Sequence, residues 1–123
     1  MAVAGAGALG AASRYLLTLG LRQVWSDSPW PVAVVNVVGC FGFGVCWAIA
    51  QGSSVPGRSP GLVATAILIG FFGAFTTFSA YALDGHLLLS ERRFGLFAVN
   101  MLVQNGLGIL ALWFGMLIGS ARS

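Results

Sequence analysis

The sequence predicts an all-α membrane protein with four transmembrane helices. Of its 123 residues, 58% are hydrophobic and only 7% are charged, and the mean hydropathy is +0.91. Soluble domains carry about 25% charged residues, so this composition excludes an ordinary water-soluble protein. A spanning helix needs about 20 mostly apolar residues, which leaves room for at most four spans. We therefore expect a single membrane domain over residues 1 to 123.

The first expected span covers residues 1 to 21. It contains three glycines at which another helix can approach closely: Gly5, Gly7 and Gly10. Its positive charges, Arg14 and Arg22, come late in the segment. A secretion signal instead places positive charge before the apolar run, so we interpret this segment as a retained helix.

The second expected span covers residues 31 to 50. It follows a polar turn between Trp25 and Trp30, whose rings suit the headgroup level of a membrane. Cys40 and Cys46 lie six residues apart in this span and face different sides, so no local disulfide is expected. Residues 51 to 60 are rich in Gly, Pro and Ser and predict a solvated loop.

The third expected span, residues 61 to 89, contains glycines and hydroxyl residues at membrane depth. Residues 70 to 81 read Gly-Phe-Phe-Gly-Ala-Phe-Thr-Thr-Phe-Ser-Ala-Tyr. Lipid offers backbone groups no hydrogen-bond partner, so irregular backbone survives there only inside protein or beside a cavity. We therefore predict a third helix broken near its middle and a site near residues 73 to 81. A charged turn then precedes the fourth span, residues 94 to 119.

The charge distribution predicts a weakly specified orientation. Four spans place both termini and the 51 to 60 loop on one side of the membrane. The arginines outside the spans divide two against three: Arg58 and Arg122 on that side, and Arg22, Arg92 and Arg93 on the other. Orientation depends on a Lys/Arg difference between the two faces. A chain that inserts both ways can form an antiparallel, dual-topology dimer.

Four motifs carry a resemblance to a known family. They lie at residues 7 to 15, 35 to 39, 70 to 79 and 93 to 95, with Asn100 following in the fourth span. In this order and spacing the chain resembles the Fluc (CrcB) fluoride channels over nearly its whole length. The third motif, Gly-x-x-Gly-x-x-Thr-Thr-Phe-Ser inside a hydrophobic span, is the specific one.

The resemblance implies a channel that exports fluoride passively across the cell membrane and lowers cytoplasmic fluoride. It also implies a dual-topology dimer with two antiparallel pores. A structural Na⁺ would lie at the dimer centre, bound by the backbone carbonyls of Gly73 and Thr76. The alternative for this segment is a plain glycine kink, stabilised by Thr and Ser side chains that bond to backbone carbonyls.

The resemblance assigns an anion pathway to polar and aromatic side chains from three spans: Asn36, Phe78, Ser79, Tyr81 and Gln104. An Asn amide donates hydrogen bonds without net charge. It can therefore bind an anion in a pore without holding it too tightly to pass on. Aromatic ring edges are electropositive and can solvate an anion. The alternatives are an interhelical hydrogen bond for Asn36 and core packing for the two rings.

The chain departs from the family at two of its polar positions. Tyr81 stands where the family usually has a second Phe, and Gly108 lacks the hydroxyl or amide that the fourth span usually offers. A related, non-identical subunit can supply the missing group, which would make a heterodimer rather than a homodimer. Alternatively, the Tyr81 hydroxyl serves as the donor.

Two charged residues remain for structural or vestibule roles. Arg14 lies well inside the first span, where a cation needs a partner or must reach the interface, so we expect it to tether helix ends. Asp84 lies one helical turn beyond Tyr81, at the edge of an expected vestibule. Neither is expected to act as a catalyst.

The sequence shows no enzyme signal. It contains no metal-ligating cluster, nucleophile triad or phosphate-binding loop, and nothing suggests nucleic acid as a partner. A small multidrug-type exporter of dual topology is the main rival. Proton-coupled export needs a carboxylate within the membrane, and the first two spans have none. A non-conducting structural subunit is the third possibility.

Overall fold

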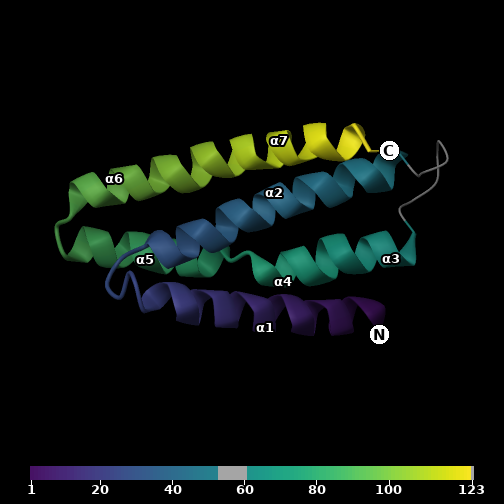
Figure 1. Ribbon diagram of the computed structural model, residues 1–123. Coiled ribbons are helices and arrows are strands. Elements are labelled where there is room, and N and C mark those ends of the chain that lie inside the picture. Colours follow the sequence, from purple (N-terminus) through teal and green to yellow (C-terminus); the bar gives the residue numbers. More distant parts are fainter. Residues whose placement is uncertain (53–60, 123) are drawn as a thin grey trace.

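The computed structural model describes residues 1–52 and 61–122, and these are almost entirely helical (Figure 1). Four helices in the described residues are long and apolar enough to cross a membrane: Ala2–Arg22 (α1), Trp30–Gly52 (α2), Leu62–Ser90 and Phe94–Ser120. The prediction of four membrane helices is thus confirmed. A loop was expected at residues 51 to 60. Residues 51 and 52 instead form the end of α2, and residues 53 to 60 lie outside the described residues.

The third span is interrupted, as predicted. It consists of α3 (Leu62–Thr65), a π-helical segment η1 (Ala66–Phe72), α4 (Gly73–Phe75) and, after a break at Thr76 and Thr77, α5 (Phe78–Ser90). The fourth span also contains a π-helical segment, which the sequence analysis missed. It consists of α6 (Phe94–Leu102), η2 (Val103–Leu107) and α7 (Gly108–Ser120).

The spans run back and forth, and both termini lie at the same end of the molecule (Figure 1). The second span lies between the third and the fourth, and α1 lies along the outer side of the third (Figure 1). A tight turn joins α5 to α6, and within it Arg92 adopts a left-handed backbone conformation with φ of 58°. The chain thus forms an antiparallel four-helix arrangement.

Glycines allow α2 and α7 to touch backbone to backbone. A Cβ added at Gly44 would collide with the Leu112 carbonyl oxygen, and one added at Gly115 would collide with that of Phe41. Helices in lipid gain no hydrophobic drive to associate, so they depend on such close packing. Gly10 of α1 meets the Phe71 carbonyl in the same way, whereas Gly5 faces open space.

The polarity of the protein is inverted relative to a soluble domain. Asn100 and Gln104 are buried in the interior, while large apolar side chains such as Leu9, Ile69 and Ile109 lie on the outside. Water would disfavour this arrangement and lipid favours it. The chain is therefore a multi-pass membrane protein.

Candidate functional site

The break in the third span is a short extended segment. Thr76 has φ −80° and ψ 155°, and Thr77 has φ −146° and ψ 111°. Thr77 caps α5, because its Oγ1 accepts a hydrogen bond of 3.3 Å from the Ala80 N–H. On the other side, Thr76 Oγ1 donates to the Phe72 carbonyl oxygen at 3.0 Å. The two threonines thus finish one helix and start the next.

Asn36 on α2 closes the break with its side-chain amide. Its Oδ1 accepts from the Thr77 N–H at 2.8 Å, and its Nδ2 donates to the Thr77 carbonyl oxygen at 3.2 Å. Gly39, one turn further along α2, makes room for the Thr76 methyl group. The amide thereby satisfies both backbone groups of Thr77, which would otherwise be costly at membrane depth.

A relay of amides runs from Asn36 into the fourth span. Asn36 Nδ2 also donates to Gln104 Oε1 at 2.6 Å, and Gln104 Nε2 donates to Asn100 Oδ1 at 2.9 Å. The Thr77 N–H can only donate, which fixes the orientation of the Asn36 amide and hence of the other two amides. Asn100 is fully buried, and its Nδ2 has no partner in the described part of the chain.

The relay places two predicted residues together and adds one that sequence reasoning missed. Asn36 and Gln104 were assigned to the anion pathway, and they bond directly to each other. Asn100 was noted only as part of a motif. Its spacing of four residues from Gln104, on one face of a helix, was the available signal.

The break also removes the helical partners of two carbonyl groups. In a continuous helix the Thr77 N–H would donate to the Gly73 carbonyl, but it donates to Asn36 instead. The Ala80 N–H would donate to the Thr76 carbonyl, but it donates to Thr77 Oγ1. Carbonyl oxygens without a helical donor are suitable ligands for a hard cation such as Na⁺. The residues present therefore fit the cation site that the resemblance implies.

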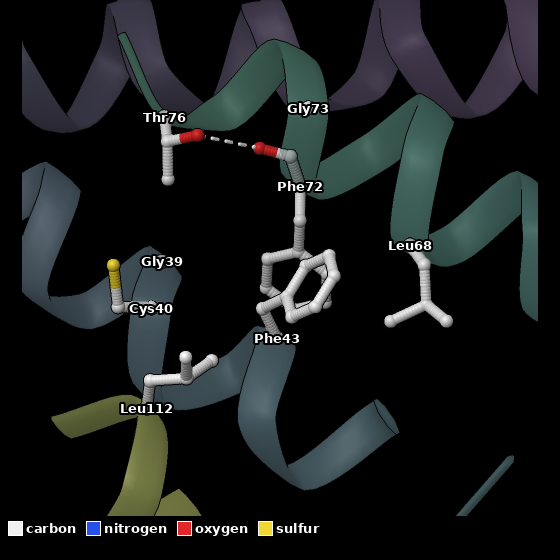
Figure 2. A pocket seen from close by; sticks show the side chains of 8 residues that line it. All are labelled: Gly39, Cys40, Phe43, Leu68, Phe72, Gly73, Thr76 and Leu112. Atoms are coloured by element: carbon white, nitrogen blue, oxygen red, sulfur yellow. Dashed lines mark hydrogen bonds between the residues drawn. The ribbon is translucent and has the colours of Figure 1, made fainter. Parts of the chain in front are cut away.

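A cavity of about 230 Å³ lies beside the break (Figure 2). It is lined by Gly39, Cys40, Phe43, Leu68, Phe72, Gly73, Thr76 and Leu112. Figure 2 also shows the hydrogen bond from Thr76 to the Phe72 carbonyl at the cavity edge. The irregular backbone thus borders a cavity, in line with the requirement for such backbone in a membrane. Cys40 carries a free thiol.

The two aromatic residues after the break lie close together but differ in exposure. The ring centroids of Phe78 and Tyr81 are 5.6 Å apart, with an angle of 58° between the ring planes. The Phe78 side chain is 79% exposed in the single chain, whereas Tyr81 is buried. Ser79 is exposed, and its Oγ lies 3.2 Å from Thr77 Oγ1. One chain therefore does not enclose the predicted anion path.

Two neighbouring polar residues of the π-helical segment η2 have different partners. Gln104 is buried and belongs to the relay, whereas Asn105 is exposed and donates to the Tyr81 hydroxyl oxygen at 2.8 Å. The Tyr81 hydroxyl in turn donates to Met101 Sδ at 2.6 Å. Gly108 packs against α2, since an added Cβ would lie 3.7 Å from Cys40 Sγ.

Arg14 and Asp84 are not bonded to the relay. Arg14 is half-buried on α1, and its Nε has no hydrogen-bond partner among the described residues. Asp84 is half-buried on α5, and its Oδ2 likewise lacks a partner in the described part of the chain.

The sequence of the chain matches a known family. Residues 1 to 116 match the family described as CrcB-like protein, Camphor Resistance (CrcB). The chain belongs to the CrcB family. This membership confirms the resemblance drawn from the motifs, and it accords with the expectation that the chain is not an enzyme.

Several relatives match nearly the whole chain. A protein of Desulforapulum autotrophicum named fluoride-specific ion channel FluC is 41% identical over 120 residues, or 95% of this chain and 92% of its own length. The FluC of Nitrosococcus oceani is 38% identical over 119 residues, which cover 96% of this chain and 91% of the relative. That of Parabacteroides distasonis is 33% identical over 114 residues, covering 92% and 86%.

Proposed function

We propose that the chain is the subunit of a fluoride-selective channel that lets fluoride leave the cell passively. Its CrcB membership and its similarity to proteins named fluoride-specific ion channels support this function. The observation that carries it is the amide relay at the break of the third span, from Asn36 through Gln104 to the unpaired donor of Asn100. Fluoride needs donors in place of its hydration water, without a fixed positive charge that would trap it.

We infer that two chains assemble in opposite orientations. Gly73, Phe78 and Ser79, which belong to the predicted ion sites, are exposed in the single chain. A second copy would cover them and complete the path, and the near balance of arginines allows both orientations. The second copy is an identical subunit in this proposal, with Tyr81 and Gln104 as the polar groups that stand in for the one missing at Gly108. A related subunit remains the alternative partner.

We further propose that a Na⁺ ion binds the carbonyl oxygens of Gly73 and Thr76 and stabilises the dimer. The support is that the helical donors of both carbonyls are engaged elsewhere. When bound, the ion would supply positive charge and fixed geometry at the centre of the assembly. The role of this chain is to hold the break open, through Asn36 and Thr77.

The direct test is fluoride release from liposomes that contain the purified protein. We expect a fluoride gradient to discharge without a proton gradient, while chloride is retained. Equal release of fluoride and chloride would contradict the selectivity. Strict dependence on a proton gradient would favour the exporter, and no release of either ion would favour the structural subunit.

A further inference from the structure

The Tyr81 hydroxyl makes two hydrogen bonds, both to residues of the fourth span. Asn105 Nδ2 donates to the hydroxyl oxygen at 2.8 Å, and the hydroxyl lies 2.6 Å from Met101 Sδ. Asn105 Nδ2 also donates to the Met101 carbonyl oxygen at 2.8 Å. Met101 and Asn105 thus enclose the phenol from one side.

The direction of each proton in this cluster follows from chemistry. The Met101 carbonyl oxygen can only accept, so the Asn105 atom beside it must be the NH₂ group. The same NH₂ group therefore donates to the Tyr81 oxygen. The phenol proton is then directed to the Met101 thioether sulfur, which is a weak acceptor.

The cluster lies partly in the π-helical segment. Gln104 belongs to the buried relay, and Asn105 is the next residue along the chain. Within the turn at Val103–Leu107, Asn105 reaches Tyr81 on α5 while Gln104 keeps its bond to Asn36.

We propose that Asn105 is a positioning residue that sets the anion selectivity of the channel through Tyr81. It holds the phenol, and so fixes the tilt of the Tyr81 ring beside Phe78, at 58° and 5.6 Å. The ring then offers its electropositive edge to the anion. This inference rests on the proposed function as a fluoride channel.

The test is a double-mutant cycle on the fluoride-to-chloride permeability ratio, measured from reversal potentials in bilayers. The proteins are the parent, Asn105→Leu, Tyr81→Phe and the double variant. We expect each single variant to lower the ratio roughly two- to tenfold, the range that one net hydrogen bond supports. The double variant should fall no further, because both changes break the same bond.

A matched control and a second variant guard against misfolding. Leu102→Ala changes an exposed side chain of α6 outside the cluster and should leave the ratio unchanged. Asn105→Ala removes the amide without adding bulk and should behave like Asn105→Leu. Additive effects in the double variant, or an Asn105 variant with the parent ratio, would overturn the proposal.

A spectroscopic measurement separates this proposal from the proposed function. Tyr15 and Tyr81 are the two tyrosines of the chain, so Tyr15→Phe leaves a single signal from ¹³Cζ-labelled tyrosine. That signal should shift with Asn105→Leu and not with Leu102→Ala. If the signal shifts with Asn105→Leu but the parent protein passes no fluoride, both the channel function and the selectivity claim are overturned. An unshifted signal in a conducting channel would overturn the positioning role alone.

Discussion

Asn36 is the residue on which the break of the third span depends. It satisfies both backbone groups of Thr77, and it orients the amides of Gln104 and Asn100. Both protons of its own amide are engaged within the chain. In the proposed channel an anion would meet this relay as an ordered set of dipoles, and Asn100 would offer the donor that has no partner among the described residues.

Asn36→Asp should keep the fold and lose fluoride release. The carboxylate still accepts from the Thr77 N–H, and the amides of Gln104 and Asn100 can both turn to donate along the relay in reverse. The Thr77 carbonyl alone loses its donor, so the loss of stability should be small. The new negative charge in a low-dielectric site then repels the anion. Thermal unfolding in detergent and liposome release would together measure these effects.

Asn36→Leu is the matched control. It leaves the Thr77 backbone groups and Gln104 without their partner, at a cost of about 1–3 kcal/mol for each unsatisfied group. It should therefore unfold at a clearly lower temperature than the Asp variant. Equal stability of the two variants would mean that the relay does not support the break.

Phe78→Ile should reduce fluoride release with little loss of stability. The Phe78 side chain is 79% exposed in the single chain, so its replacement removes few contacts within the fold. It does remove the ring edge that we assign to the anion path. Release rates and unfolding temperatures measured on the same preparation would separate the two effects. A proportional loss of both would identify Phe78 as a packing residue.

Sequence reasoning found the residue types of the site but not their partners. A polar side chain within an apolar span must be satisfied, so Asn36 and Gln104 stood out from the sequence. Their bonds join residues 41 and 68 positions apart, and no local pattern predicts such pairs. For Tyr81 the sequence left open whether the hydroxyl or the ring edge serves the anion path. The partners of the hydroxyl, Met101 and Asn105, became known only from the structure.

At the scale of elements, α2 and α7 are held together by glycines that lie against the backbone of the facing helix. The break at Thr76 and Thr77 could be predicted, because Gly, Thr and Ser interrupt an apolar run. The π-helical segments could not. Ala66–Phe72 is wholly apolar apart from its glycine, and Val103–Leu107 has the composition of an ordinary polar helix turn.

Gly115→Ala should destabilise the protein by about 1–3 kcal/mol, the usual cost of overpacking. The added methyl group would collide with the Phe41 carbonyl, and backbone cannot move aside as a side chain can. Gly20→Ala is the control, because nothing lies within 4 Å of its added Cβ. Alanine favours helix there, so that variant should be neutral or slightly more stable. Similar unfolding temperatures for both variants would contradict the packing argument.

At the scale of the whole molecule, the chain is a four-helix membrane protein whose candidate ion sites lie partly on its surface. Family membership could be predicted because the motifs run along the whole chain. The dimer could be predicted only as a possibility. The two faces of the membrane domain differ by one arginine, which permits both orientations without requiring them.

Removing Na⁺ should weaken the assembly. In the proposed dimer, the carbonyl oxygens of Gly73 and Thr76 have lost their helical donors and would face those of the second subunit without a cation between them. We expect the unfolding temperature and the dimer fraction to rise with Na⁺ concentration, and not with an equal concentration of a bulky organic cation. Indifference to Na⁺ in both measurements would favour the plain kink.

The wide turn at Val103–Leu107 has a consequence for how this chain tolerates changes of length. Gln104 within the turn bonds to Asn36, while Gly115 and Gly119 after it lie against α2. Each residue of an α-helix advances the face by about 100°, and a π turn absorbs one additional residue. Deleting one residue of this turn other than Gln104 would convert it to a regular α turn and keep the two halves in phase. A deletion between Leu107 and Gly115 would instead turn the glycines about 100° away from α2. The fourth span should therefore tolerate the loss of one residue at its centre, but not in α7 next to it.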